Sequence, residues 1–572
     1  MSHHVFQWNK SKKPPSCLSD NSPEWVAFLR DDVIGEGTSI PTAFGMRPLL
    51  YADYTASGRA LGFVENAVYQ QLLPFYANTH TETSYTGKVT TRYRESARQV
   101  VAHAVGANDD YAVLFAGAGA TAAIDRCCKI LELQPREDTS SDVRPVIFIG
   151  PYEHHSNDLI WRECDADLVR ISLGSDGLIC LEELETQLKR YVDRPLKIAA
   201  FSAASNVTGI KTDVSAIAML VHRYDGLALF DYAASGPYVE INVAGTGKND
   251  HLDAVFVSPH KFIGGPGSSG VLVIRKALCR NAIPSVAGGG TVSYVTATEH
   301  RYVSDIQRRE EGGTPDILGN IRAGLAFRVK SLVGVDYIEA QEKAMITMAM
   351  ARWSTLDNLT LLGPVDAPRL SIFSFNIRAG QRDIHHNLIV AMLNDLFGIQ
   401  ARGGCSCAGP YGHELLSIDA DTALEHERLV QKGRSLYRPG WVRLGFHFFF
   451  SNESANYVIS AVEFITRYAA VLMKLYTADE KSGVWTVRQH LVENQPSMPA
   501  ISLDALFTQA SSASEATFEE GEDYFAKARD IVALAEQADL PASTASSDEP
   551  IRWFWWPHEA DKAMQSQIEM TQ

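Results

Sequence analysis

The chain of 572 residues is 45% hydrophobic and 21% charged, which is typical of a folded globular protein and excludes a disordered, collagen-like or disulfide-stapled chain. Its net charge of −16 opposes general binding to DNA, RNA or anionic lipid, because their phosphates would repel it. Eight cysteines are few for this length, and neither a signal-peptide pattern nor an apolar run of about 18 residues is present, so we expect free thiols in a reducing cytoplasm and no membrane span.

Short apolar runs alternate with amphipathic stretches through the first half of the chain. The runs are continuously apolar, as in strands buried on both faces, and lie at 112–115, 146–149, 168–171, 198–201, 227–231, 254–258 and 271–274. Helices are predicted at 121–132, 181–191 and 214–224. This pattern predicts an α/β fold, with a mostly parallel seven-stranded sheet covered by helices in a large domain over 50–330, after an N-terminal segment over 1–49.

A smaller α/β domain is predicted over 331–480. Its predicted elements are a helix at 337–356, a strand at 370–377, a helix at 385–397, a strand at 442–449 and a helix at 455–476.

An acidic extension is predicted over 481–572. Residues 497–572 hold 14 acidic and 4 basic side chains, a net charge of −10, in a composition rich in Ser, Ala, Pro and Glu. One helix is predicted at 519–534. The aromatic run Trp553–Pro557 is atypical of a solvated tail, so we expect it to pack on the body of the protein.

The residues that follow the predicted strands are candidates for a ligand site, because open α/β sheets bind ligands at the carboxyl ends of their strands. The small-residue turn over 116–121 suits a phosphate, although such turns also serve to pack a helix on a strand. The pair His154 and His155 suits a proton relay or a stacking surface, and metal ligation is the least favoured reading because adjacent side chains diverge. Asp231 ends a buried strand, where a carboxylate either engages a cation or caps a helix.

Lys261 gives the sharpest signal. It follows the strand at 254–258 and precedes a glycine-rich stretch, and a lysine there is costly to desolvate unless it is paired or chemically engaged. A Schiff base is one engagement that fits, with Asp231 as the partner of a pyridinium nitrogen.

At these residues the sequence resembles the class V aminotransferase and cysteine desulfurase family of pyridoxal-phosphate enzymes. The motifs are Ser-x-His-Lys followed by glycines, Glu-His-His, Ser-Asn-Val-Thr-Gly over 205–209 and the strand-end aspartate, in the family's order between about residues 50 and 476. The resemblance implies fold-type I, the cofactor pyridoxal 5'-phosphate (PLP) and a homodimer with active sites at the subunit interface.

The resemblance also implies the cofactor contacts. Lys261 would carry the Schiff base and move protons, Asp231 would keep the pyridine nitrogen protonated, and His154 would stack on the ring. Asn206 would lie near the phenolic oxygen and the substrate carboxylate. The residues implied around the phosphate are Ala120, Thr121, Ser258, His260 and, from the other subunit, Thr314.

The segment Arg402-Gly-Gly-Cys405-Ser-Cys407-Ala-Gly-Pro resembles the cysteine segment of the selenocysteine-lyase-like desulfurases. This implies that the Cys407 thiolate takes the substrate sulfur and leaves a persulfide and alanine. Arg402 or a nearby histidine would favour the thiolate. Arg402 would also contact the substrate, and Arg443 resembles the arginine that grips its carboxylate. From the residues alone, Cys405 and Cys407 also suit a plain turn or a metal site with His413, and we expect no resident metal.

Two features depart from the desulfurases. Ala234 stands where they carry a glutamine on the phenolic oxygen of the cofactor, and residues 410–440 are longer than in small desulfurases, which would suit a lid or a surface for a sulfur-acceptor protein. The leading hypothesis is C–S cleavage of cysteine or a related amino acid. The alternatives are another class V reaction (a C–S β-lyase, an epimerase, an aminotransferase or a molybdenum-cofactor-sulfurase-like enzyme) and a non-catalytic scaffold.

Overall fold

The structure of the protein is a computed structural model that describes residues 23–135, 144–492, 523–542 and 551–571. The chain divides into two compact units. The first spans 1–34, 54–343 and 366–370, and the second spans 35–53, 344–365 and 371–572. The domain boundaries at 49, 330 and 480 stay predictions. In the described ranges, no helix combines the length and the apolar character that a membrane crossing requires.

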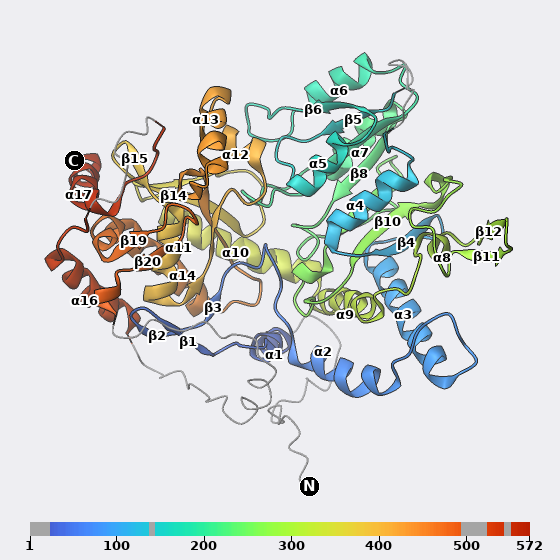
Figure 1. Ribbon diagram of the computed structural model, residues 1–572, viewed down its shortest axis with the longest axis horizontal. Coiled ribbons are helices and arrows are strands. Elements are labelled where there is room, and N and C mark those ends of the chain that lie inside the picture. Colours follow the sequence, from blue (N-terminus) through green and yellow to red (C-terminus); the bar gives the residue numbers. More distant parts are fainter. Residues whose placement is uncertain (1–22, 136–143, 493–522, 543–550, 572) are drawn as a thin grey trace, which may run out of the picture. The chain divides into compact units, whose positions relative to one another are not determined.

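The first unit is built on a seven-stranded sheet in the order β4-β10-β9-β8-β7-β5-β6 (Figure 1). Six strands point the same way, and β10 runs antiparallel to both of its neighbours. This confirms the predicted fold class, and every predicted strand end falls within one residue of the observed one. The strands are β4 (Tyr111–Ala116), β5 (Val146–Ile149), β6 (Asp167–Arg170), β7 (Lys197–Ser202), β8 (Leu227–Asp231), β9 (Ala254–Val257) and β10 (Gly270–Arg275).

Helices cover this sheet because its strands are apolar on both faces. Helix α4 lies over the seven-stranded sheet in Figure 1. Its buried residues Ile124 and Cys127 belong to one core cluster with Leu114 and Phe256 of the sheet. The three predicted helices are confirmed to within two residues. The helices and the hairpin of this unit are α1 (Pro23–Asp32), α2 (Gly62–Ala67), α3 (Tyr85–Ala104), α4 (Gly119–Ile130), α5 (Leu159–Arg162), α6 (Leu181–Arg190), α7 (Val214–Arg223), β11 (Val292–Val295), β12 (His300–Tyr302), α8 (Ile306–Glu310) and α9 (Ile317–Val333).

The second unit holds an antiparallel sheet in the order β13-β14-β18-β17, with β15 beside β14. Its elements are β1 (Ser39–Thr42), β2 (Gly45–Pro48), β3 (Leu50–Tyr51), β13 (Leu359–Leu361), β14 (Ile372–Ala379), β15 (Arg382–Ile384), α11 (His386–Phe397), β16 (Ile399–Gln400), β17 (Arg402–Gly404), α12 (Gly409–Leu415), α13 (Ala420–Gln431), β18 (Trp441–Gly445), α14 (Asn452–Leu472), β19 (Tyr476–Ala478), β20 (Trp485–Val487), α16 (Tyr524–Gln537) and α17 (Ala560–Thr571). Helix α10 (Val335–Trp353) ends in this unit.

The predicted elements of this second unit exist, but several of their bounds were wrong. The strand predicted to reach Phe449 ends at Gly445, because the chain then turns and the Phe450 N–H donates to the His447 carbonyl. Helix α14 starts three residues before the predicted start at residue 455, because the Ser451 hydroxyl caps it by accepting from the Ser454 N–H. The start predicted for the helix at 519–534 lies outside the described residues, and α16 begins after Asp523, which caps it.

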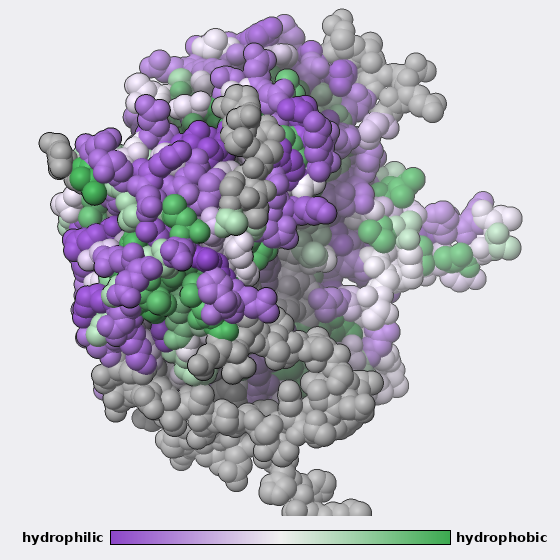
Figure 2. Space-filling view, turned by 60° about the vertical axis from the view of Figure 1, so that its left-hand side comes forward, coloured by the Kyte–Doolittle hydropathy of each residue, from purple (hydrophilic) through white to green (hydrophobic). Residues whose placement is uncertain are grey.

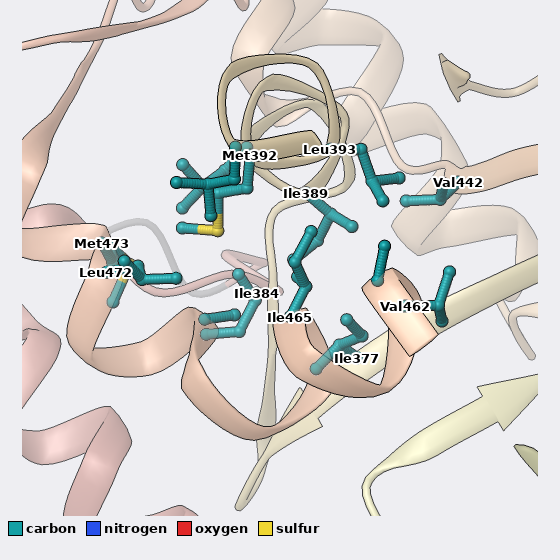
Figure 3. Close-up of a cluster of buried hydrophobic side chains, with 14 of the residues drawn as sticks. Ile377, Ile384, Ile389, Met392, Leu393, Val442, Val462, Ile465, Leu472 and Met473 are labelled. Atoms are coloured by element: carbon teal, nitrogen blue, oxygen red, sulfur yellow. The ribbon is translucent and has the colours of Figure 1, made fainter. Parts of the chain in front are cut away.

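The core of the second unit lies between α11, α14 and the sheet (Figure 3), and the aromatic run of the extension packs onto it. Phe554 is fully buried, and its ring meets Tyr437 and His385 edge-on at centroid distances of 5.5 and 5.1 Å. Two backbone hydrogen bonds join Asp383 to the run. The Asp383 N–H donates to the Trp553 carbonyl, and the Trp555 N–H donates to the Asp383 carbonyl. The prediction that this run packs on the body is confirmed.

Candidate active site

The carboxyl ends of β4, β5, β7, β8 and β9 lie along one edge of the seven-stranded sheet, because these strands run in the same direction. The turns that follow these ends carry most of the residues proposed to bind a cofactor. The sheet therefore gathers candidates that are far apart in the sequence.

The turn between β4 and α4 packs closely against the segment after β9. The Ala120 N–H donates to the Ser258 Oγ at 2.8 Å. Gly119 has a φ of +60°, and a Cβ there would lie only 2.9 Å from the Ser258 Oγ and 3.5 Å from the Nε2 of His260. Only glycine at position 119 leaves room for the Ser258 hydroxyl and the His260 imidazole. Both side chains therefore lie at the start of a 12-residue helix.

Thr121 joins the same cluster from the first turn of α4. Its Oγ1 lies 2.7 Å from the Oγ of Ser156, which belongs to the turn after β5. The structure therefore brings together hydroxyls from two strand ends at one helix N-terminus.

Asp231 and Lys261 interact electrostatically at the ends of β8 and β9. Burial raises the pKa of the Asp231 carboxyl, while the Ala233 N–H, which donates to its Oδ1 at 2.8 Å, and the charge of Lys261 act in the opposite direction. Burial and the charge of Lys261 lower the pKa of His260 to about 4, so this ring is neutral at pH 7. Asp231 caps no helix, because residues 233–239 form turns.

His154 and Asn206 occupy two further turns of this edge. The Nδ1 of His154 accepts from the Ser156 N–H at 3.1 Å, and its ring is tilted by 47° from that of His155, with centroids 6.3 Å apart. Asn206 is buried in a turn that Ser205 fixes, since the Ser205 Oγ accepts from two following backbone N–H groups.

Thr314 lies on an exposed loop, where its hydroxyl accepts from Asn78 at 3.4 Å. Just before it in sequence, Glu311 is buried and pairs with Arg94 and Arg98, with Arg98 Nη1 at 2.8 Å. Glu311 also accepts from the Phe115 N–H at 2.7 Å, so it ties the loop to β4 and α3. The structure does not group Thr314 with the other cofactor candidates of its unit.

In the second unit, Arg402 and Arg443 stand opposite each other on β17 and β18 and share the carboxylate of Asp53. The Arg443 Nη2 lies 3.0 Å from Asp53 Oδ1, and the Arg402 Nε lies 3.0 Å from Asp53 Oδ2. Arg443 is buried and Arg402 is half exposed. Two guanidinium charges against one carboxylate leave an excess of one positive charge, which suits an anionic substrate group.

Cys407 lies on a strained turn between β17 and α12. Ser406 and Cys407 have φ values of 52° and 55°, a left-handed conformation that costs non-glycine residues about 1–3 kcal/mol each. Cys407 is exposed, whereas Cys405 is only partly exposed. Burial lowers the pKa of Arg443, while the attraction of Asp53 and of the Cys407 sulfur favours its charged form.

The potential metal-ligand group that the described residues contain does not involve Cys405, Cys407 or His413. It consists of His222, His251 and Asp253, at the opposite end of the sheet. Arg275 already occupies this group, since its Nη1 donates to the His251 Nε2 at 2.9 Å and lies 3.2 Å from Asp253.

Two residues that support the site, Asp53 and Glu153, are not among those predicted from the sequence. Asp53 follows the short apolar strand β3, so the rule that singled out Asp231, a carboxylate at a strand end, could have found it. Glu153 stands in the Glu-His-His motif beside the two predicted histidines, and it is 1% exposed.

Known proteins are similar to this chain over most of its length. The profile of the family described as Aminotransferase class-V matches residues 50–455. A probable cysteine desulfurase of Halalkalibacterium halodurans is 30% identical over 367 residues, which are 64% of this chain and 85% of the relative. A cysteine desulfurase of Escherichia coli O9:H4 is 28% identical over 369 residues, again 64% of this chain and 85% of the relative.

Two solved structures share the fold. The apo cysteine desulfurase of Thermococcus onnurineus matches with a TM-score of 0.60 at 23% identity, over 73% of this chain and 94% of that one. The S-sulfonic acid form of the cysteine desulfurase CsdA of Escherichia coli matches with a TM-score of 0.59 at 20% identity, over 77% and 98%. With the family profile and the strand-end residues in its order, these findings establish that the chain belongs to the class V aminotransferase family of pyridoxal-phosphate-dependent enzymes.

Proposed function

We propose that this protein is a cysteine desulfurase, which transfers the sulfur of cysteine to Cys407 and releases alanine. The observation that carries the proposal is an exposed thiol on a strained turn after β17, in the same unit as two arginines that share one carboxylate. The relatives named cysteine desulfurase support it.

The residues of the first unit fit pyridoxal phosphate. A helix N-terminus, two hydroxyls and a neutral imidazole suit its phosphate, and the close approach at Gly119 keeps that cradle free of a Cβ. The buried Asp231 suits a protonated pyridine nitrogen. Bound there, the cofactor would supply an electron sink for charge that develops on the substrate carbon.

Each cofactor residue then has a distinct task. Asp231 would hold the proton on the pyridine nitrogen, and His154 would cover one face of the ring. Lys261 would bind the cofactor covalently and carry protons to and from the substrate carbon. Asn206 would lie near the phenolic oxygen, where Ala234 leaves no polar group, and Thr314 would reach the phosphate from a second copy of the chain.

The second unit would bind the substrate and receive its sulfur. Arg443 would hold the substrate carboxylate, and Arg402 would favour the thiolate of Cys407. This thiolate attacks the substrate sulfur and the C–S bond breaks. The electron pair of the broken C–S bond stays on the substrate carbon, which takes a proton and becomes the methyl group of alanine. The transferred sulfur remains on Cys407 as a persulfide.

A homodimer is part of this proposal. The first unit exposes several large apolar side chains in the segment that follows α2, on α3, and on or before the β11–β12 hairpin, whose projecting arm shows green residues in Figure 2. Exposed apolar side chains that gather on a surface mark protein–protein interfaces, which supports contact with a second copy of the chain. The exposed residues are Tyr69, Phe75, Tyr76, Tyr85, Tyr93, Ile283, Tyr294 and Val295. Measuring the mass of the protein in solution at micromolar concentration tests this proposal. We expect the mass of a dimer, and the mass of a monomer would contradict it.

We further propose a sulfur-acceptor protein and a reducing cytoplasm as the setting. Helices α12 and α13 fill the long stretch that follows Cys407 in the chain, and α13 exposes Leu424, which supports this stretch as the docking surface for the acceptor. The seven described cysteines are all free thiols.

The test is product analysis with cysteine as substrate. The full chain, loaded with pyridoxal phosphate, is expected to release alanine in step with persulfide on Cys407. Cys407→Ser should lower alanine formation at least a hundredfold, because no thiolate then accepts the sulfur. Cys405→Ser is the matched control two residues away and should keep activity within a few fold.

Other products would point to the alternatives. Pyruvate in place of alanine would identify a β-elimination, and a racemised amino acid would identify an epimerase. A Lys261→Ala protein that keeps the visible absorption of bound cofactor would refute the role of this lysine. If the wild-type chain takes up no cofactor at all, the non-catalytic scaffold is the hypothesis that remains.

A further inference from the structure

Glu153 is a buried carboxyl group with no task in the proposed reaction. It follows β5, is 1% exposed and accepts three hydrogen bonds. Its Oε1 accepts from the Ser202 N–H at 2.9 Å, and its Oε2 accepts from the Ser202 Oγ and the Asn157 Nδ2, both at 2.6 Å. A buried carboxyl costs several kcal/mol to desolvate, so its presence needs a reason beyond packing.

The partners of Glu153 lead to two cofactor residues. Ser202 is the last residue of β7 and stands in register beside Asp231, and the N–H of Ala203, the residue after β7, donates to the Asp231 carbonyl at 2.9 Å. Asn157 ends the short helical turn that His154 caps, and its N–H donates to the His154 carbonyl at 2.8 Å. One carboxyl thus ties the turn that carries His154 to the strand edge that carries Asp231.

The surroundings of Glu153 are built around this role. A Cβ at Gly150 would lie 2.4 Å from the Glu153 Oε1, so only glycine leaves room for the carboxyl. The Asn157 side chain is itself fixed, because its Oδ1 accepts from the Trp161 Nε1 at 2.9 Å. Burial and, to a smaller extent, the charge of Asp231 raise the pKa of Glu153 to about 7, against the lowering by its hydrogen-bond donors, so Glu153 senses the aspartate electrostatically.

We propose that Glu153 is a positioning residue of the cofactor site, whose carboxyl sets the placement of His154 and Asp231 around the pyridine ring. This inference rests on the proposed binding of pyridoxal phosphate at these residues. Glu153 touches neither cofactor nor substrate in this account. It acts through the two residues that do, so its loss changes how the ring is held.

The test compares Glu153→Gln with wild type as full chains, stripped of cofactor and then titrated with pyridoxal phosphate. A glutamine still accepts from the Ser202 N–H, but its amide N–H₂ faces that of Asn157, donor against donor. We expect about tenfold weaker cofactor binding. We also expect an altered visible circular dichroism band of the bound cofactor, which reports ring orientation and which a purely structural role would not move.

Two further variants sharpen the result. The double variant Glu153→Gln with Asn157→Asp restores the donor–acceptor match between these two side chains, but it loses the bond that the Asn157 Nδ2 donates to the Ala200 carbonyl at 3.3 Å. It should therefore recover part of the affinity and of the dichroism band. Glu182→Gln, exposed on α6, is the matched control and should resemble wild type. If Glu153→Gln does not fold, Ser202→Ala decides, since it removes one of the three donors and should shift both readouts in the same direction by less.

The outcomes separate the two proposals. A folded Glu153→Gln protein with wild-type affinity and an unchanged dichroism band would overturn the positioning role. An unchanged Ser202→Ala protein would do so where Glu153→Gln cannot be obtained folded. A wild-type protein that binds no pyridoxal phosphate would instead refute the proposed function on which this inference rests.

Discussion

Asp53 illustrates, at the scale of single residues, how one side chain holds two functional candidates in place. It is the shared counter-charge of Arg402 and Arg443. Because β17 and β18 place these arginines directly opposite each other, their charges would repel without it. Its task is therefore electrostatic support of the two arginines that we propose to bind the substrate.

Asp53→Ala should destabilise the protein by about 3 kcal/mol, because removing one partner of a buried ion pair leaves the Arg443 charge uncompensated. Denaturant unfolding of the full chain measures this loss. Asp530→Ala, at an exposed position of α16, should change the stability by less than about 0.5 kcal/mol. Equal effects of the two substitutions would contradict the role of Asp53.

At the scale of elements, ion pairs fasten helices and loops to the large sheet. His222, near the end of α7, lies 2.8 Å from the carboxylate of Asp253, which also accepts from the Ala228 N–H at the start of β8. His251 and Arg275 face the same carboxylate. This cluster lies at the end of the sheet opposite the cofactor candidates, so it serves stability.

The His222–Asp253 pair predicts a pH dependence of stability. Burial alone would lower the pKa of His222, but the bond to Asp253 and that to the Asn249 carbonyl raise it above its usual value. The contribution of His222 to stability is therefore present below about pH 6.5 and is lost as the pH rises through the folded-state pKa of His222. Burial raises the pKa of Asp253, but the bonds from His222 and from the Ala228 N–H lower it overall, so its contribution to stability is present above about pH 3.8 and is lost as the pH falls.

His222→Gln should consequently lose most stability near pH 5–6 and least above pH 8, as measured by unfolding across this range. The neighbour His251 gives the control, because burial and the charge of His222 lower its pKa. His251→Gln should therefore improve in stability relative to wild type as the pH falls. A His222→Gln deficit that grows above pH 7 would show that the pair is not charged as described.

At the scale of the whole molecule, the acidic extension contributes structure as well as charge. Its described part belongs to the second compact unit, and Phe554, Trp555 and Trp556 are buried in that unit's core. Helix α17 continues this packing beside α14 and β14. Truncating the chain before this run would therefore expose a hydrophobic core.

Phe554→Ala should lower the free energy of unfolding by about 3 kcal/mol, because a fully buried phenylalanine leaves a cavity when it is truncated. Thermal and denaturant unfolding of the full chain measure the effect. Ile568→Ala, half exposed on α17, is the control and should stay within about 0.5 kcal/mol of wild type. A tolerated Phe554→Ala would mean that the extension contributes little to the core.

Much of the fold and of the candidate site could be predicted because their signals are local. Continuous apolar runs mark buried parallel strands, and Asp231, Lys261 and the turn over 116–121 each stand directly after one of them. The bounds in the second unit were less accurate. They depend on caps such as Ser451 and on turns such as 447–450, whose hydrogen bonds decide where an element ends.

The sequence by itself determined the fold class, the strand ends that carry the candidate residues and the family, because periodicity and motif spacing are written in neighbouring residues. Only the tertiary structure decided which distant residues act on one another. Asp53 meets Arg443 across 390 positions, and Glu153 meets Ser202 across 49. Such pairs depend on strand order and register, which bring side chains together through the folded sheet rather than along the chain.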